Sequence, residues 1–460
     1  MVEHIVNSPS SLSFVYNTLI RAYNQVDESK RAILLFCEML NDPIARNLPD
    51  KFTFPFVVKS CSDMLGVEEG KQVHCFVMKS QFGNDPYVQS CLISMYGKCG
   101  KIESALKVFE GMTSENVVSW NAMVNGFIKA GDIVAAQGLF DKMPERNIVS
   151  WNSMIAGYAR ESLLEEAIDL LVEMQVLGVR PDESTLVGII SAISDLGLLS
   201  LGKRVHGYIM RYEFSLDSGL GATLIDMYSK CGRVYDAFQV FELILNKNVG
   251  HWTSIIVGLA IHGFTKAALC LFSEMECLGV QPNHVTFVGV LSACSHGGLV
   301  EKGLEYFNLM RGKYNIEPKI QHYGCLVDLL ARSGLLKEAK VLVESMPIEP
   351  DAVIWSTLLA SCKNHDNVEI GEIAAERLMK FTPDYGSGYV LMSNLYAGSG
   401  RWKDFGRVRR ALDERGVEKV AGLSWIEVDG KTHEFLAGDK YHPSSLEIYR
   451  LLGRIECQLR

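Results

Sequence analysis

Apolar residues recur along most of the chain at the spacing of one helix face. Two similar phrases show the pattern: VVSWNAMVNGF begins at Val117, and IVSWNSMIAGY begins at Ile148. In both phrases apolar residues follow the tryptophan at helical intervals: Trp120, Met123, Val124, Phe127 and Ile128, and then Trp151, Met154, Ile155, Tyr158 and Ala159. This spacing is typical of an amphipathic α-helix. It predicts a buried stripe that begins at each tryptophan.

A short turn and a second helix are predicted to follow the first. Gly131 can end the first helix because glycine adopts the left-handed conformation without steric cost. A second apolar stripe then runs through Ile133, Ala136, Leu139, Phe140 and Met143. Pro144 follows and stops this helix. The predicted unit is therefore a helix, a short turn and another helix.

The unit recurs in both directions along the chain. Close copies begin with CLISMYGKCG at Cys91 and TLIDMYSKCG at Thr223, and looser copies begin at Thr18 and Ser254. After an N-terminal segment, 1–12, the predicted units are 13–50, 51–85, 86–116, 117–147, 148–182, 183–217, 218–248, 249–283, 284–319 and 320–351. One helix pair cannot bury its apolar faces alone, so neighbouring units must share a continuous core. The sequence predicts an all-α solenoid.

Two families of helical repeats compete for this pattern. Tetratricopeptide repeats also have A-x3-F in the second helix, as at Ala105 and Phe109. Their characteristic L-G-x2-Y phrase is missing here, and their length of about 34 residues is constant, whereas the units of this chain vary in length. The pattern therefore disfavours tetratricopeptide repeats.

Nearly the whole repeat region resembles plant pentatricopeptide repeat proteins. The phrases at 117–147 and 148–182 carry the resemblance, together with LVGIISAISDLGLLSLGKRVHGYI at Leu186 and DMYSKCG at Asp226. Units 148–182, 183–217 and 218–248 resemble the ordinary (P), long (L) and short (S) repeats of the PLS subclass, and 320–351 resembles a final S repeat. The resemblance implies a right-handed α-solenoid that binds single-stranded organellar RNA, in this subclass mostly for cytidine-to-uridine editing.

The fifth and last residues of a unit are the candidate base readers. Two polar side chains at this spacing can reach the Watson–Crick edge of one base, which gives one base per repeat. The resemblance implies uridine for Asn17 with Asp50 and for Asn152 with Asp182, a pyrimidine for Asn121 with Asn147, and adenine for Ser90 with Asn116 and for Thr253 with Asn283. Without the resemblance, an equally good explanation is that Asn121 and Asn152 cap a helix or bond to the backbone near its start. The implied order is U·AYU··A, where dots are unread bases.

Several units depart from this code. The fifth residues of the long units are apolar (Pro55, Val187 and Val288), and Ala222 and Gly324 also fall outside the code. Second residues, which would flank the bases, fit an apolar role in six units: Phe14, Phe52, Tyr87, Val118, Val149 and Val285. Ser184, Gly219 and Gly250 do not fit it.

The pattern changes after residue 351. Segments 352–385 and 386–419 still read as helix pairs and resemble the two E motifs of editing factors. Residues 420–460 resemble the E+ extension that precedes the family's DYW deaminase domain. Within it, SWIEVDGKTHEF at Ser424 predicts a β-hairpin with Asp429 and Gly430 at the turn.

The residues of a zinc deaminase are missing from this sequence. Such an enzyme needs H-x-E, with a metal-binding histidine and a proton-shuttling glutamate, and a downstream C-x-x-C pair. No histidine here has glutamate two positions later, and His433 and Glu434 are adjacent. We therefore expect no catalytic residue, no metal site, no cofactor and no enzymatic activity. The resemblance instead implies a DYW-type cytidine deaminase acting in trans and multiple organellar RNA editing factors as partners.

Composition narrows these expectations. The net charge of −9 argues against general polyanion binding, so RNA recognition must depend on local groups. A basic run at Arg401, Lys403, Arg407, Arg409 and Arg410 could contact RNA or form a solvated helix face. None of the 12 cysteines forms C-x-x-C, and five lie in apolar helical patterns: Cys91, Cys99, Cys231, Cys294 and Cys325. We expect them to be small buried side chains in a reducing compartment.

The sequence leaves alternatives for the cellular compartment of the protein and for its exact role. The chain has no apolar run near the ~20 residues of a membrane span, and the N-terminus is not a convincing transit peptide. We expect a soluble protein in the mitochondrion, with the chloroplast as the alternative. The favoured role is recognition of an editing site. The alternatives are a splicing or stability factor for organellar RNA and a scaffold of tetratricopeptide type that binds proteins.

Overall fold

The computed structural model describes residues 9–41, 49–381, 386–414, 422–428, 431–436 and 440–459. Helices α2 to α26 and one two-stranded sheet make up their regular structure. The chain divides into two compact units, Met1–Ala192 and Ile193–Arg460, and the division falls inside helix α12. Nothing in the described part is long and apolar enough to serve as a membrane-spanning helix.

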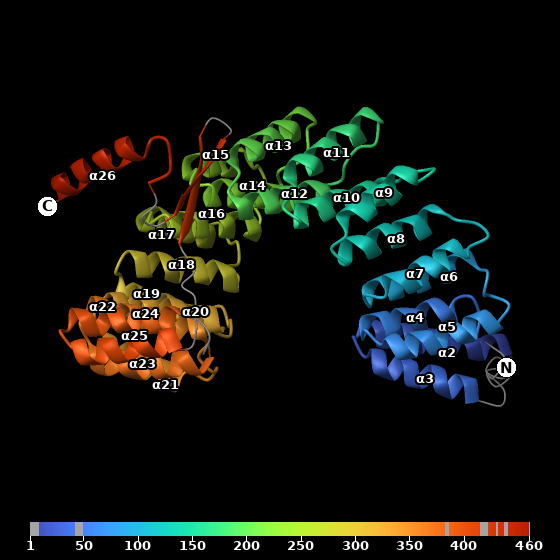
Figure 1. Cartoon of the computed structure of the whole chain (residues 1–460), viewed down its shortest axis with the longest axis horizontal. Helices are drawn as coiled ribbons and strands as arrows, with labels where there is room; N and C mark the ends of the chain where they lie inside the picture. The colour runs from blue at the N-terminus through green and yellow to red at the C-terminus, as the bar shows by residue number, and fades with distance from the viewer. Residues whose placement is uncertain are drawn as a thin grey trace. The chain divides into compact units, whose positions relative to one another are not determined.

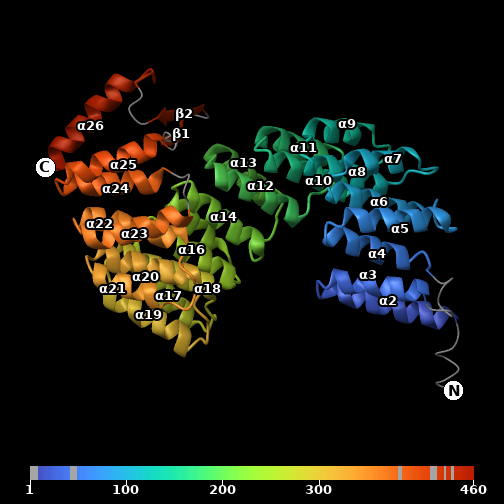
Figure 2. The same ribbon diagram turned by 60° about the horizontal axis from the view of Figure 1, so that its bottom comes forward.

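The first compact unit consists of helix pairs. Its helices are α2 (Pro9–Gln25), α3 (Ser29–Asn41), α4 (Thr53–Asp63), α5 (Val67–Lys79), α6 (Pro86–Lys98), α7 (Ile102–Glu110), α8 (Val117–Lys129), α9 (Ile133–Lys142), α10 (Ile148–Arg160), α11 (Leu164–Val176) and the start of α12 (Glu183–Leu196). The first helices of successive pairs pack on one another, in the order α2, α4, α6, α8 and α10. Each second helix packs against its own first helix (Figures 1 and 2).

The second compact unit continues the same construction. Its helices are α13 (Leu199–Arg211), α14 (Gly219–Lys230), α15 (Val234–Leu243), α16 (Val249–Ile261), α17 (Thr265–Cys277), α18 (His284–His296), α19 (Val300–Gly312), α20 (Ile320–Arg332), α21 (Leu336–Ser345), α22 (Ala352–Asn364), α23 (Val368–Phe381), α24 (Ser387–Gly398), α25 (Trp402–Glu414) and α26 (Ser445–Leu459). The first helices again pack in sequence from α14 to α24. The predicted all-α solenoid of stacked helix pairs is confirmed.

Residues close in sequence cap the start of the first helices and end them. Asn116 caps α8 by accepting a hydrogen bond from the Ser119 N–H, and the Ser119 hydroxyl accepts one from the Asn116 N–H. Asn147 and Ser150 repeat this capping box at α10. Gly131, at the turn after α8, has φ of 81° and so occupies the left-handed region as predicted. Helix, turn and helix therefore follow from short-range signals.

The tryptophan stripes form much of the core, with one difference from the prediction. Trp151 is buried and packs edge-on against Phe140, with ring centroids 4.9 Å apart. Trp120 packs against Phe109 in the same manner, with 4.8 Å between centroids, but it is only half-buried. The Arg146 guanidinium covers the Trp151 ring at 5.7 Å. Glu115 stands at the corresponding place before Trp120, and its carboxylate cannot make a cation–π contact of this kind.

All 12 cysteines are free thiols, and their burial varies. Cys294 is buried as expected, whereas Cys91, Cys99, Cys231 and Cys325 are only partly buried. The expectation of full burial was therefore wrong for these four. Burial nevertheless raises the pKa of the Cys325 thiol to about 12, so this side chain stays protonated near neutral pH.

The tail ends in a hairpin and a helix. Strands β1 (Leu423–Val428) and β2 (Lys431–Leu436) pair antiparallel, with Val428 opposite Lys431, so the predicted hairpin is confirmed. The predicted turn residues, Asp429 and Gly430, lie outside the described residues. The Trp425 indole N–H donates to the Leu196 carbonyl at 3.2 Å, which joins the hairpin to the end of α12.

Candidate functional site

Three of the five predicted reading pairs are joined directly by hydrogen bonds. The Asn17 amide donates to both Asp50 carboxylate oxygens, at 3.2 and 3.3 Å. The Asn152 amide donates to Asp182 Oδ2 at 3.0 Å. The Asn121 amide donates to Asn147 Oδ1 at 3.2 Å. In these three units the fifth residue of the unit therefore meets the last residue of the same unit.

These bonds fix which way each amide points. An ionised carboxylate only accepts, so Asn17 must turn its NH2 group towards Asp50. Asn147 Oδ1 accepts from the Ser150 N–H at 3.1 Å, which orients Asn147 and in turn Asn121. Asn17 Oδ1 and Asn121 Oδ1 are buried, and no partner for either occurs in the described part of the chain. Each is an acceptor that a donor from a ligand could satisfy.

The other two pairs are built differently. The Ser90 hydroxyl donates to the Pro86 carbonyl at 2.7 Å, and its predicted partner Asn116 caps α8. The Thr253 hydroxyl lies 2.7 Å from the Thr286 hydroxyl. Asn283 caps α18 by accepting from the Thr286 N–H at 2.9 Å. In these pairs each reading side chain is held by a third group.

The units outside the code carry small or apolar fifth residues. Pro55 is buried within α4, and Val187 and Val288 are partly buried. Ala222 and Gly324 are also partly buried. None of these five side chains can donate or accept a hydrogen bond at a base edge.

Second residues of the units form a repeated set of exposed apolar side chains. Their exposed fractions range from 41% for Val285 to 71% for Phe14, and the set is Phe14, Phe52, Tyr87, Val118, Val149 and Val285. Each lies three positions before a fifth residue, so the two share one helix face. Large apolar side chains exposed at the same place in unit after unit indicate a surface that meets a ligand.

A further set of residues was missed by the sequence analysis. The third residue of the following unit carries a buried hydroxyl that contacts the last residue of the unit before it: Thr53, Ser119, Ser150, Thr185 and Thr286. The Thr185 hydroxyl also contacts Asn152 Oδ1. The signal was present in the sequence as Asp or Asn followed three residues later by Ser or Thr, the spacing of a capping box.

The surroundings of Asp182 favour its ionised form. Burial alone would raise the pKa of this carboxyl, but hydrogen bonds from the Thr185 N–H, the Thr185 hydroxyl and the Asn152 amide outweigh burial and hold the pKa below its usual range. Asp182 therefore presents a carboxylate to Asn152 at neutral pH.

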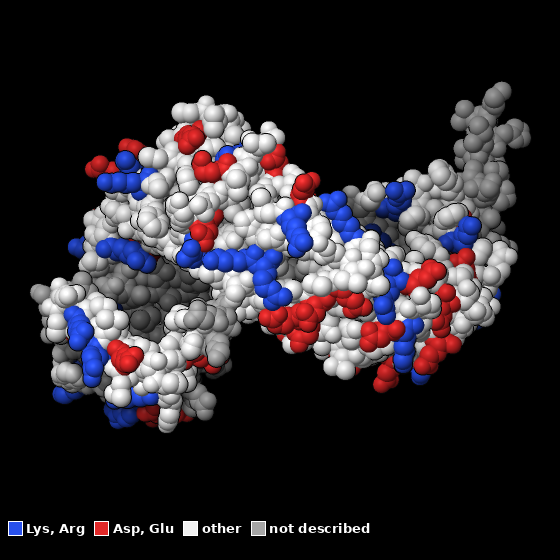
Figure 3. All heavy atoms as spheres, turned by 90° about the horizontal axis from the view of Figure 1, so that it is seen from above, with Lys and Arg blue, Asp and Glu red and all other residues white. Residues whose placement is uncertain are grey.

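Charged side chains of the tail are largely engaged with one another. Arg401 pairs with Glu372 at 3.0 Å and with Asp404 at 2.7 Å, and Arg407 pairs with Asp404 at 3.0 Å. Arg409 lies over the Phe405 ring. On the face shown in Figure 3, Lys and Arg side chains are scattered among Asp and Glu side chains. The predicted basic run is thus partly neutralised by its own neighbours.

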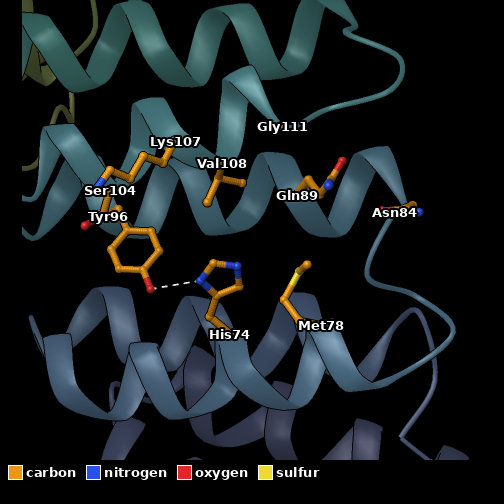
Figure 4. A pocket seen from close by; sticks show the side chains of 9 residues that line it. All are labelled: His74, Met78, Asn84, Gln89, Tyr96, Ser104, Lys107, Val108 and Gly111. Atoms are coloured by element: carbon orange, nitrogen blue, oxygen red, sulfur yellow. Dashed lines mark hydrogen bonds between the residues drawn. The ribbon is translucent and has the colours of Figure 1, made fainter.

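Two pockets lie between neighbouring helices, away from the predicted reading pairs. One of about 320 Å³ lies between α5, α6 and α7, where the Tyr96 hydroxyl is 3.0 Å from His74 Nδ1 (Figure 4). A second, of about 430 Å³, has the corresponding pair His206 and Tyr228, 2.8 Å apart. Burial lowers the pKa of both histidines, which favours neutral imidazole. No predicted reading residue lines either pocket, and the described residues hold no group of three or more potential metal ligands.

Family models match most of the chain. The PPR repeat model matches residues 14–44, 90–117, 118–148, 223–249, 285–314 and 322–349, and the PPR repeat family model matches 146–195 and 247–296. The E motif model matches 365–427, and the E+ motif model matches 432–455. The tail resemblance thus agrees with independent models of both motifs.

Curated relatives come from Arabidopsis thaliana. A chloroplastic pentatricopeptide repeat-containing protein is 39% identical over 89% of this chain and 52% of its own length. A chloroplastic/mitochondrial one is 41% identical over 97% of this chain and 67% of its own length. A third, described without an organelle, is 44% identical over 95% of this chain and 81% of its own. The chain thus spans about half the length of the first of these relatives.

A solved structure has the same fold. The pentatricopeptide repeat protein PPR10, in complex with an 18-nt psaJ RNA element, superposes with a TM-score of 0.67 at 18% identity. The match covers 88% of this chain and 61% of that one. At this identity the likeness supports the fold alone.

Proposed function

This chain belongs to the pentatricopeptide repeat proteins, and from that membership we propose that it binds single-stranded RNA and reads one base per repeat. One observation carries the proposal. In units 13–50, 117–147 and 148–182 a hydrogen-bonded polar pair made by the fifth and last residues stands beside an exposed apolar second residue, as in Asn152, Asp182 and Val149. The apolar side chain suits the face of a base, and the polar pair suits its edge.

Hydrogen-bond chemistry supports a uridine assignment where an asparagine has its NH2 group turned inward. Asn17 then offers Oδ1 as the acceptor, and uracil carries an N3–H donor on its Watson–Crick edge. The proposed reading residues are Asn17, Asp50, Ser90, Asn116, Asn121, Asn147, Asn152, Asp182, Thr253 and Asn283. The proposed preference is U·AYU··A from 5′ to 3′.

The tail motifs support a role in cytidine-to-uridine editing. We propose that the repeats, 13–351, place the RNA and that the E motifs, 352–419, and the extension, 420–460, engage a DYW-type cytidine deaminase in trans, together with multiple organellar RNA editing factors. The matches to the E motif, 365–427, and to the E+ motif, 432–455, support this proposal. The names of the relatives support an organelle, and we propose the mitochondrion, with the chloroplast as the alternative.

Two experiments test the proposal. Filter binding compares RNA that carries U·AYU··A with RNA in which either adenine is replaced by guanine. We expect roughly tenfold weaker binding for each swap, at about 1–3 kcal/mol per base contact. Equal binding would contradict base reading. Organelle transcriptomes of plants that lack the protein should show at least one unedited site; altered splicing or transcript abundance with editing intact would assign it to RNA processing instead.

A further inference from the structure

The side chain of Thr286 stands behind an adenine-reading pair without being able to touch the base. Thr286 is the third residue of α18 and is completely buried. Its hydroxyl lies 2.7 Å from the Thr253 hydroxyl and 3.1 Å from Asn283 Oδ1. It also accepts from the Asn283 N–H at 3.1 Å. One buried atom therefore contacts both residues that are proposed to read the eighth base.

Counting protons fixes the direction of each bond. A threonine hydroxyl has one proton and two lone pairs. If Thr286 donates to Asn283 Oδ1, then Thr253 must donate to Thr286, and all three bonds form. If Thr286 donates to Thr253 instead, its bond to Asn283 Oδ1 is lost. The first arrangement makes one more hydrogen bond in a buried place, where an unmade bond is costly.

The consequence is a fixed polarity for the pair. The Thr253 hydroxyl donates its proton to Thr286, so its lone pairs can accept a hydrogen bond from a ligand. Asn283 Oδ1 accepts from both the Thr286 N–H and the Thr286 hydroxyl, which turns the NH2 group outward as a donor. Adenine carries a donor at its 6-substituent and an acceptor at N1, whereas guanine carries an acceptor at O6 and a donor at N1. A pair of fixed polarity can distinguish these two inverted patterns.

We propose that Thr286 is a positioning residue for base recognition: it fixes the hydrogen-bonding polarity of Thr253 and Asn283 and thereby sets their preference for adenine over guanine. This inference rests on the proposed function. Without the Thr286 hydroxyl, Thr253 could rotate its proton outward and the Asn283 side chain would lose one of its two inward bonds. The pair could then match either purine.

The other adenine-reading unit supplies a matched control. Ser119 is the equivalent buried third residue, but its hydroxyl donates to the Asn116 carbonyl at 2.8 Å. The Ser90 hydroxyl instead donates to the Pro86 carbonyl at 2.7 Å, within its own helix. Ser119→Ala therefore removes a capping hydroxyl, as Thr286→Val does, without releasing the proton of the reading residue.

The test measures binding of the full chain to synthetic RNA with U, A, C, U and A at the first, third, fourth, fifth and eighth bases. Guanine replaces adenine at the third or eighth base, and fluorescence anisotropy gives the ratio of dissociation constants. We expect Thr286→Val to reduce a roughly tenfold ratio at the eighth base to near one, and to leave the ratio at the third base unchanged. Thr286→Ser should retain the wild-type ratio, and Ser119→Ala should retain the ratio at the third base.

Each outcome separates the two ideas. Wild-type protein that shows no adenine preference at either base would contradict the proposed function. A wild-type preference that persists at the eighth base in Thr286→Val would overturn the role of Thr286. A uniform loss of affinity changes neither ratio, so it counts as that second outcome. Circular dichroism confirms that each variant keeps its helices.

Discussion

Units 148–182 and 249–283 link their fifth and last residues by hydrogen bonds in two different ways. In the first, the Asn152 amide donates directly to the Asp182 carboxylate at 3.0 Å. In the second, Thr253 is too short for this and is linked to Asn283 through the Thr286 hydroxyl. The long amide spans the gap between neighbouring units by itself, whereas the short hydroxyl needs a buried residue from the next unit.

The difference teaches that a reading pair is part of a larger hydrogen-bond network. In both units the third residue of the next first helix caps that helix and also contacts the fifth residue, through Thr185 in one and Thr286 in the other. The two units differ in their second residue as well: Val149 is exposed, whereas Gly250 has no side chain. These differences can be tested by exchanging residues between the units.

The largest effect is expected from converting one pair into the other. Asn152→Thr combined with Asp182→Asn recreates the Thr–Asn pair in a unit that already has Thr185 behind it. Preference at the fifth base should shift from uridine to adenine by up to a hundredfold in the ratio of dissociation constants, because each side chain pair contributes about 1–3 kcal/mol. Fluorescence anisotropy with the two RNAs measures the ratio.

A single change provides the control for this exchange. Asp182→Asn alone leaves an Asn–Asn pair like that of Asn121 and Asn147, and asparagine still caps a helix well. It should bind either pyrimidine at the fifth base and still disfavour adenine. If the double variant keeps the wild-type uridine preference, the pair does not read that base.

A smaller effect is expected from Thr253→Asn. This change gives unit 249–283 the same pair as unit 117–147, so preference at the eighth base should move from adenine towards a pyrimidine by roughly tenfold. Ser356→Asn is the matched control, because Ser356 is the fifth residue of segment 352–385, to which no base is assigned. An unchanged adenine preference in Thr253→Asn would argue against its role.

The second residues should contribute affinity without base preference. Val149→Gly removes an exposed apolar side chain and makes this unit resemble unit 249–283, whose second residue is Gly250. We expect about three- to tenfold weaker binding to every RNA, because contact with a base face does not depend on base identity. Val353→Gly, which removes an even more exposed valine from the tail, should leave RNA affinity unchanged. Equal losses in both variants would point to a general effect on helix stability.

The smallest effect concerns pH. Hydrogen bonds hold the pKa of Asp182 below its usual range despite burial, so its ionised form stabilises the fold. That contribution is present above the usual pKa of aspartate, near 4, and is lost as the pH falls through the lower folded value. The midpoint of urea unfolding should therefore favour wild type over Asp182→Asn most at pH 6, and the advantage should shrink towards pH 2. A constant difference would show that Asp182 titrates normally.

Much of the fold could be predicted because its signals are local. The apolar stripe after Trp151 and the left-handed Gly131 each act within a few residues of sequence, and the structure has both as predicted. The caps of α8 and α10 are Asn116 and Asn147, and not Asn121 and Asn152, for which capping was the alternative explanation. The partial exposure of Trp120 could not be predicted in this way. It depends on whether a side chain from the preceding loop, such as Arg146 at Trp151, covers the ring.

The sequence by itself determined the repeated helix pair and the positions of the candidate reading residues. Only the tertiary structure decided which of those residues bond to each other. Asn152 and Asp182 meet directly, whereas Thr253 and Asn283 meet through Thr286. The physical reason is the distance along the chain over which each interaction acts. Helical periodicity and caps depend on neighbours along the chain, but a hydrogen bond between units depends on distance and direction to a few tenths of an ångström. The packing of one first helix on the next sets both.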